Sequence, residues 1–326
     1  MEPEQKAYKY EMKPLFKERM QSLLPDKEDF DNFEKIVHTG PQSFIRCNTL
    51  KISTKELLTK LQKKWKVIQP FPKHPEIMLI TQDLGPGELG NALEHLLGYY
   101  YVQEVSSMMS AIALEPKPDE LILDLCASPG SKTTQIAAKM ENKGTIIAND
   151  LKIDRIKILS SNLERCGVTN TIITRQDAIG LCAKLSKSEF KFDKILLDAP
   201  CSGEGTLRSS PKTFIMWNPK VIEKFSRQQK KFIAFALKCL KKGGTLVYST
   251  CTHSPEEDES VIDFAVKNFP VKIESFTLPL KCRPGITAWK NDSFHKEVQK
   301  SCRIYPHDND SEGFFVCKMT LMEEIK

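Results

Sequence analysis

The sequence predicts an α/β fold in which parallel strands and helices alternate, and three observations lead to it. Residues 121–125 form a short apolar run typical of a buried strand, and a loop with Pro129 and Gly130 leads on to a helix-forming segment at 133–140. The same rhythm of strand and helix returns further along the chain. Polar residues follow the expected strands, as they do where a doubly wound sheet binds its ligand.

The composition is that of a soluble globular protein. The 326 residues are enough for one large domain and a smaller one, and 40% hydrophobic with 28% charged residues is ordinary for such a chain. No stretch has the apolar length of a membrane span, and the polar start of the chain does not resemble a secretory signal. We therefore expect a cytoplasmic protein with no membrane partner.

Ten cysteines are scattered along the chain without a CxxC pair, and the six histidines show no ligand spacing with them. The sequence therefore predicts no metal site. In a cytoplasmic protein the thiols are expected to be reduced, and most of these cysteines are expected to be small buried apolar residues.

The net charge of +6 is concentrated in two basic blocks. Residues 46–75 hold eight Lys or Arg against Glu56 alone, and residues 206–242 hold ten against Glu223 alone. Two blocks of this kind favour a nucleic acid as partner. The alternative is that they are solvated helix faces.

The first part of the chain divides at a turn and at a proline-rich linker. Residues 15–24 and 30–37 have helical spacing, and Asp26 between them is a plausible N-cap. The next segments alternate between strand and helix patterns as far as Pro116 and Pro118. They comprise expected strands at 44–50, 66–69 and 77–80 and expected helices at 53–62 and 106–114. We thus predict N-terminal helices in 1–40, a small α+β domain in 41–118 and a large α/β domain in 119–326.

The large domain continues with regular alternation. After 121–140 the expected strands lie at 145–148, 171–174, 192–197, 243–248, 271–276 and 313–319. The expected helices lie at 154–166, 219–240 and 256–268. Between the last two strands we expect an irregular polar loop of about 35 residues.

Four acidic residues follow the expected strands: Asp124, Asp150, Asp177 and Asp198. Asp150 comes about 20 residues after the first loop, a separation at which a carboxylate accepts hydrogen bonds from ribose hydroxyls. Asp177 is placed to accept from an adenine amino group. Together they predict a nucleoside pocket, and the absence of GxGxxG disfavours a dehydrogenase.

Two cysteines also follow expected strands, Cys201 after Asp198 and Cys251 after Ser249 and Thr250. If both strands are central, both thiols face one crevice. With Lys132 and a carboxylate nearby, this pattern indicates covalent catalysis by a thiolate of lowered pKa. The spacing does not say which cysteine attacks.

Three motifs carry a resemblance to a known family. LDLCASPGSKTTQ (123–135), DAPCSGEGT (198–206) and YSTCTHSPEEDESVI (248–262) resemble the cofactor, catalytic-loop and nucleophile motifs of the Nol/Nop/Sun (RsmB-like) RNA cytosine-5 methyltransferases. RCNTLK (46–51) and VQEVSS (102–107) resemble stretches ahead of that core.

The resemblance implies S-adenosylmethionine as methyl donor, a seven-stranded Rossmann-like sheet with a reversed last strand, and a small domain like an RNA-recognition motif. It implies that Cys251 is the nucleophile, that Cys201 assists release, that Asp198 engages the cytosine and that Lys132 orders the site. The implied cofactor contacts are Cys126, Ala127, Ser128, Pro129, Gly130, Ser131, Lys132, Asp150, Arg155, Asp177 and Asp198. Ser128, Ser131 and Thr252 depart from the usual family residues without removing a reactive group.

The expected partner is RNA, with transfer RNA as first choice and ribosomal RNA second, and the chain is expected to act as a monomer. The candidate RNA contacts are Arg46, Lys51, Lys224, Arg227, Lys230 and Lys231. An exocyclic amino methyltransferase is disfavoured because DAPC replaces [DN]PP[FYW]. A non-catalytic RNA-binding or assembly factor on the same scaffold is the alternative from another class.

Overall fold

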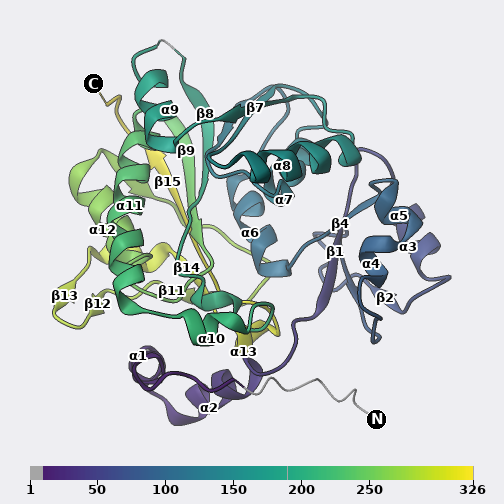
Figure 1. Cartoon of the computed structure of the whole chain (residues 1–326). Coiled ribbons are helices and arrows are strands. Elements are labelled where there is room, and N and C mark those ends of the chain that lie inside the picture. The colour runs from purple at the N-terminus through teal and green to yellow at the C-terminus, as the bar shows by residue number, and fades with distance from the viewer. Residues whose placement is uncertain (1–9, 189, 326) are drawn as a thin grey trace.

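The computed structural model describes residues 10–188 and 190–325. The start of the chain, on which the expectation about a secretory signal rests, lies outside these residues. The described chain forms a large sheet, a separate four-stranded sheet and a short hairpin (Figure 1). No helix in the described ranges is long and apolar enough to cross a bilayer.

The large sheet confirms the α/β prediction. Its spatial order is β11-β14-β15-β9-β8-β5-β6-β7, and β10 also pairs with β15. The strands are β5 (Leu121–Asp124), β6 (Thr145–Asp150), β7 (Thr171–Arg175), β8 (Phe192–Asp198), β9 (Leu240–Thr250), β10 (Val271–Ile273), β11 (Arg283–Pro284), β14 (Cys302–Ile304) and β15 (Phe314–Leu321). Strands β5 to β9 are parallel and β15 runs antiparallel to β9, which is the expected reversal. The sheet has nine strands where seven were expected.

Helices cover both faces of this sheet (Figure 1). One face packs on α6 (Val105–Leu114) and α7 (Ser131–Lys139), with α8 (Ile153–Cys166) beside α7. The other face packs on α9 (Ala178–Leu185), α11 (Pro219–Leu237) and α12 (Glu259–Asn268). Residues on both faces of the central strands are therefore buried, and the exposed chemistry is left to the strand ends.

The segment between β10 and β15 is not the irregular loop that was expected. Besides β11 and β14 it contains the hairpin β12 (Ala288–Trp289) and β13 (Asp292–Ser293), the 3₁₀ helix η2 (Lys296–Lys300) and α13 (Pro306–Asn309). Strands this short leave too few residues for a periodic pattern, which is why the sequence did not reveal them.

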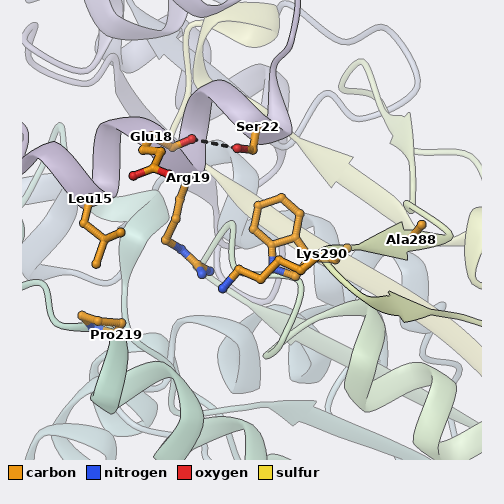
Figure 2. Close-up of a pocket in the computed structure, with 8 residues that line it drawn as sticks. Leu15, Glu18, Arg19, Ser22, Pro219, Ala288 and Lys290 are labelled. Atoms are coloured by element: carbon orange, nitrogen blue, oxygen red, sulfur yellow. Dashed lines mark hydrogen bonds between the residues drawn. The ribbon is translucent and has the colours of Figure 1, made fainter.

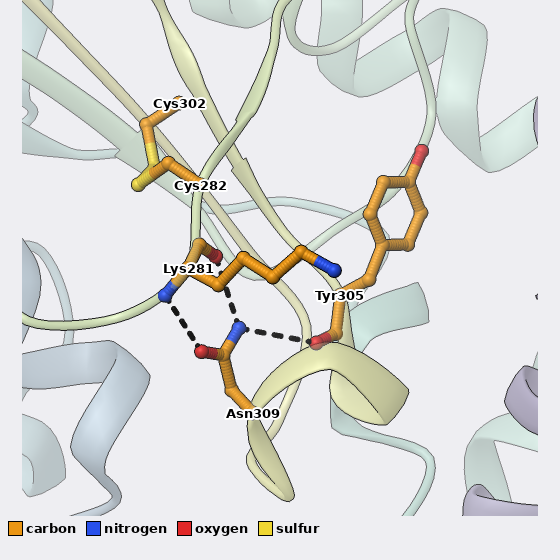
Figure 3. Close-up of a disulfide and its surroundings, with 5 residues drawn as sticks. All are labelled: Lys281, Cys282, Cys302, Tyr305 and Asn309. Carbon is orange, nitrogen blue, oxygen red and sulfur yellow. Dashed lines mark hydrogen bonds between the residues drawn. A yellow bond between two sulfur atoms is a disulfide. The ribbon is translucent and has the colours of Figure 1, made fainter.

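The expectation of reduced thiols is wrong for one pair, because Cys282 and Cys302 form a disulfide (Figure 3). Pairing of β11 with β14 brings their Cα atoms to 5.1 Å, a separation at which a disulfide forms. Of the eight other cysteines, Cys126, Cys201 and Cys251 are partly exposed and the remaining five are buried, as expected.

The small sheet has the order β2-β3-β1-β4 and is wholly antiparallel. Its strands are β1 (Ser43–Cys47), β2 (Val67–Ile68), β3 (Ile77–Ile80) and β4 (Tyr100–Val102), and its helices are α3 (Thr54–Leu61), α4 (Glu88–Asn91) and α5 (Leu93–Leu96). The capping box between Ser53 and Glu56 starts α3 where the sequence predicted it.

Arg46 in β1 is not a surface residue, so its assignment as an RNA contact is wrong. Only 3% of it is exposed, and burial lowers the pKa of its guanidinium to about 10. It donates hydrogen bonds to the carbonyl of Ser131 at 2.8 Å and the Thr134 hydroxyl at 2.8 Å, both in α7. Arg46 therefore fastens the small sheet to the first helix after β5.

The N-terminal helices are α1 (Pro14–Leu23) and α2 (Lys27–Ile36), and Asp26 caps α2 as predicted. They bury an aromatic face against the short helix α10 (Lys212–Met216) and its neighbours, with Phe16 and Phe33 packed near Trp217 and Tyr305. Arg283 joins Asp29 of α2 to Asp308 of α13. The loop that follows β8 contains η1 (Glu204–Thr206), whose Glu204 accepts from Trp217 Nε1 at 2.6 Å.

Candidate active site

A cavity of about 530 Å³ opens where the parallel strands end. Residues after β5, β6, β7, β8 and β9 line it, and α11 adds Phe225, Gln228 and Phe232. The predicted site residues that line it are Cys126, Ser128, Asp150, Arg155, Asp177, Asp198, Cys201 and Cys251. Ala127, Pro129, Gly130, Ser131 and Lys132 are not among the described residues that line it.

Asp150 ends β6 and lies beside the loop that precedes α7. Its carboxylate accepts from the Ser128 amide at 3.3 Å and from Arg155 Nε at 3.1 Å, and Arg155 also donates to the Ser128 carbonyl at 2.7 Å. Arg155 therefore holds the loop and the carboxylate in a fixed relation. Asp177 lies next to them, where it caps α9 by accepting from the Gly180 amide at 2.9 Å.

The loop turns sharply at Gly130, which has φ of +100°. This conformation favours glycine, and a Cβ there would also lie 3.1 Å from Leu159 Cδ1, so the leucine side chain would have to shift slightly. Ser131 is already the first residue of α7, and a helical backbone accepts a side chain. The departure from the usual family residue at 131 is thereby accommodated.

Lys132 and Asp198 form an ion pair on the wall of the cavity, with Nζ 2.8 Å from Oδ2. Lys132 also donates to the Ser107 hydroxyl at 2.9 Å. The other oxygen of Asp198 accepts from the Ser249 hydroxyl at 2.8 Å. The Asp198 carboxylate is thus held from both sides and keeps a defined orientation.

Asp124, by contrast, does not reach the cavity. It is 1% exposed, accepts from the Thr133 hydroxyl at 2.7 Å, and burial raises its pKa to about 7. Its place in the expected nucleoside pocket is therefore wrong, and it instead links β5 to α7.

Cys201 and Cys251 meet at the cavity, with 3.2 Å between their sulfur atoms. Strands β8 and β9 are parallel neighbours in register, Asp198 beside Ser249, so the loops that follow them start side by side. The hydrogen bond with Cys251 and burial raise the pKa of the Cys201 thiol well above its usual value. The expected lowering of a cysteine pKa is therefore wrong for Cys201, which keeps its proton.

Sequence reasoning missed two groups that fix the Cys201 loop. Glu257 Oε2 accepts from the Ser202 amide and from Gln229 Nε2, both at 3.0 Å, and Gln229 Nε2 also donates to the Pro200 carbonyl at 2.9 Å. Burial raises the pKa of Glu257 to about 7. The signal was the run of four acids at 256–259 inside the Cys251 motif, since four adjacent acids close to a thiol are unusual for a solvated turn.

A cavity at the carboxyl ends of a Rossmann-like sheet, bordered by fixed carboxylates and by two adjacent thiols, suits a nucleoside donor with a short reactive tail. The class that this fold and site define is the S-adenosylmethionine-dependent methyltransferases. The family model for the 16S rRNA methyltransferase RsmB/F matches residues 111–320, and that for the N-terminal domain of the 16S rRNA methyltransferase RsmF matches residues 12–105. The chain belongs to the RsmB/F family of methyltransferases.

Relatives of known name agree with this family. The chain is 41% identical over 316 residues to the tRNA (cytosine(49)-C(5))-methyltransferase of Pyrococcus abyssi, covering 96% of this chain and 98% of the relative. It is 38% identical to the ribosomal RNA small subunit methyltransferase F of Erwinia tasmaniensis, covering 96% of this chain but only 64% of the relative.

Solved structures give the same result. NSun6 from Pyrococcus horikoshii, solved with the S-adenosylmethionine analogue SFG, superposes with a TM-score of 0.83 at 29% identity, covering 97% of this chain and all of that one. A methyltransferase homologue from the same organism superposes with a TM-score of 0.81 at 32% identity, covering 94% of each chain.

Proposed function

We propose that this protein transfers a methyl group from S-adenosylmethionine to carbon 5 of a cytosine in RNA through a covalent cysteine–cytosine intermediate. The observation that carries the proposal is the pair of thiols 3.2 Å apart in a cavity that also holds a fixed carboxylate. A methyltransferase that acts on an amino group or an oxygen needs neither thiol.

The residues around the cavity suit the donor. The carboxylates of Asp150 and Asp177 can accept from ribose hydroxyls and from the adenine amino group. Cys126, Ser128 and Arg155 border the same space, and Gly130 shapes the loop that includes Ala127, Pro129, Ser131 and Lys132. When bound there, S-adenosylmethionine supplies a methyl group on a positively charged sulfur.

The thiols and the carboxylate divide the chemistry between them. The Cys251 thiolate adds to carbon 6 of the cytosine, which makes carbon 5 electron-rich enough to accept the methyl group. Asp198, held by Lys132, engages N3 and the 4-amino group during this addition. A base then removes the proton from carbon 5 and the Cys251 sulfur leaves. We assign Cys201 to this release step because its raised pKa keeps a proton beside the departing thiolate.

Transfer RNA is the first substrate to test and ribosomal RNA the second. The chain matches almost the whole length of the Pyrococcus abyssi relative that acts on tRNA, whereas it spans about two thirds of the rRNA relative from Erwinia tasmaniensis. A chain with one small domain beside the core is suited to a compact RNA. We also propose that the protein acts as a monomer in the cytoplasm.

Two surfaces are suited to hold the RNA. The unit 41–118 would read the RNA beside the catalytic unit 119–326. Its candidate contacts are Lys51, whose Nζ also donates to the carbonyls of Leu97 at 3.0 Å and Arg165 at 2.7 Å, and the block of Lys63, Lys64 and Lys66. On α11 the exposed residues Lys220, Lys224, Arg227 and Lys231 fall on one stripe, next to the stripe of Phe225, Gln228 and Phe232 that lines the cavity. Lys230 is turned away from it and donates to Ser260 at 2.8 Å. Phosphates bound along the exposed stripe would run past the mouth of the cavity.

The test is transfer of labelled methyl from S-adenosylmethionine to total cellular RNA, followed by nucleoside analysis and by bisulfite mapping of the modified cytosines. We expect 5-methylcytosine in the tRNA fraction. Label on an amino group would exclude the covalent mechanism. Binding of RNA without any transfer would favour the non-catalytic RNA-binding factor.

A further inference from the structure

A second cavity, of about 490 Å³, lies between α1, the start of α11 and the β12–β13 hairpin (Figure 2). Leu15, Arg19, Pro219, Trp289 and Lys290 are among its walls. None of the described residues that line it also lines the first cavity. The residues of the second cavity therefore have no part in binding the methyl donor or in positioning the two thiols.

One helix joins the two cavities. Pro219, the first residue of α11, lines the second cavity, and Phe225 lines the first. Six residues of helix rise by about 9 Å. That distance corresponds to roughly two or three nucleotides along a stacked strand, which rises by about 3.4 Å per nucleotide. The exposed cations Lys220 and Lys224 lie between the two cavities on the same helix.

The charges of the second cavity are nearly balanced. Arg19 makes a two-pronged pair with Glu256, at 3.0 and 2.8 Å, and Lys290 Nζ lies 3.6 Å from the same carboxylate. Among the described residues that line the cavity, the acid is Glu18. Because Arg19 and Lys290 already face a carboxylate, the cavity suits a neutral base better than a phosphate.

Flat and apolar groups complete the lining. Trp289 is 7% exposed, with its ring 5.3 Å from the guanidinium carbon of Arg19 and 5.8 Å from Lys290 Nζ, so only a small part of the ring is open to the cavity. Leu15 and Pro219 line the same space. Aromatic and apolar walls with donors and acceptors at the edge are the surroundings in which proteins hold an unstacked base.

The backbone presents Lys290 in a conformation that a lysine rarely adopts. Lys290 has φ of +54° in the two-residue turn between β12 and β13. Turns of this length favour such angles and usually place Asn or Gly there. The turn therefore fixes the direction in which the Lys290 backbone presents its side chain beside the cavity.

We propose that the second cavity receives one base of the RNA substrate, two or three nucleotides from the target cytosine. The base lies between Leu15, Pro219 and Trp289, and its polar edge meets Lys290 and Glu18. The phosphates on either side follow Lys220 and Lys224 toward the catalytic cavity. This assignment rests on the proposed function and specifies how the RNA is held.

An abasic scan tests the proposal. The probe is a tRNA fragment that carries cytosine 49, the position named for the Pyrococcus abyssi relative, with one abasic nucleotide moved stepwise across it. For the wild-type protein, we expect one position near the target to raise KM and the dissociation constant roughly tenfold, with kcat unchanged. Leu15→Ala and Lys290→Ala should weaken binding of the intact fragment and lose the sensitivity to that abasic position.

Lys267→Ala is the matched control, because Lys267 is an exposed lysine on α12 paired with Asp263 and outside both cavities. It should behave like the wild type. A flat scan, or equal losses for intact and abasic RNA in the Lys290 variant, would overturn the assignment. Affinity is measured separately from turnover. If one abasic position weakens binding as expected but no methyl group is transferred, the cavity assignment stands and the proposed function is refuted.

Discussion

At the scale of single residues, the chemistry depends on two sulfur atoms that different strands bring to one point. If Cys251 attacks and Cys201 assists release, Cys251→Ala should abolish both methyl transfer and covalent RNA adduct. Cys201→Ala should leave attack intact and accumulate the adduct. Denaturing gels with labelled RNA measure the adduct, and nucleoside analysis measures the product.

The reverse pattern, an adduct with Cys251→Ala and none with Cys201→Ala, would exchange the two roles. Ser107→Ala serves as a control, because Ser107 contacts Lys132 without contacting either sulfur. It should lower turnover without trapping an adduct.

Glu257 gives a prediction about pH. Burial raises its pKa from 4.5 to about 7, so between these values the folded protein keeps a proton that the unfolded chain releases. This contribution to the free energy of unfolding therefore falls as the pH rises from 4.5 to 7. Glu257→Gln should remove this share of the fall, about 3 kcal/mol by the usual conversion of pKa shifts, while Asp124 and Glu312, whose pKa values burial also raises to about 7, keep theirs. Urea unfolding of both proteins across this range measures the difference.

The neighbouring Glu256 is the matched control with the opposite sign. Although burial opposes it, the hydrogen bond and charge of Arg19 lower the pKa of Glu256 to about 2. Its stabilisation is complete above 4.5 and is lost as the pH falls toward 2. Glu256→Gln should therefore leave the fall between pH 4.5 and 7 in place.

At the scale of elements, the sequence predicted helices correctly where a segment was long or began with a capping residue. Asp26 located the start of α2, and apolar residues at helical spacing located α8. Three-residue β4 and two-residue β11 were missed because they are too short to show alternation. Arg46 was misread because a sequence shows its charge but not the burial that comes from packing against α7.

The lysines between the end of α3 and the start of β2 lead to a prediction about how RNA affinity depends on salt concentration. Lys63, Lys64 and Lys66 are exposed there. If they contact phosphates, replacing all three with Gln should weaken RNA binding and reduce the slope of log affinity against log salt by roughly 2. Lys143, Lys267 and Lys272, which are paired with acids elsewhere, provide an equal change of charge as control. An unchanged slope would mean that the block is solvated surface.

The disulfide that joins the start of β11 to β14 carries a prediction about stability. Its partners are 20 residues apart in the chain. Closing a loop of this length stabilises a fold by about 3 kcal/mol in the chain-entropy account. Cys282→Ser should lower the free energy of unfolding by this amount under oxidising conditions. With a reductant present, wild type and variant should unfold alike, and a persistent difference would mean that Cys282 acts through packing.

At the scale of the whole molecule, the donor should stabilise the fold by binding only its native state. At a concentration one hundred times the dissociation constant the gain is about 2.7 kcal/mol. S-adenosylmethionine should therefore raise the melting temperature, and Asp150→Ala should lose most of the rise. Differential scanning fluorimetry measures both. Lys157→Ala, on the exposed side of α8, should keep the full rise.

The site was predictable to the extent that motifs mark strand ends. Cys201, Cys251, Asp150 and Asp177 all border the cavity, because parallel strands end at one edge. Glu257 and Gln229 were not predictable, since they reach the Cys201 loop from a turn and from a helix that only folding brings together. The prediction that Asp124 lies in the nucleoside pocket was wrong, because a carboxylate at the end of a strand can also point into the core.

Strand β15 lies in the interior of the sheet, between β9 and β14, although it comes last among the strands in the chain. During synthesis, β9, which leads to Cys251, therefore has no β15 to pair with until residues 314–321 have left the ribosomal exit tunnel. A nascent chain that stops before them has both cysteine motifs yet lacks the strand that covers the β9 edge. We expect such truncated chains to lack methyl-transfer activity, because the strand that ends at Cys251 is left at an open sheet edge.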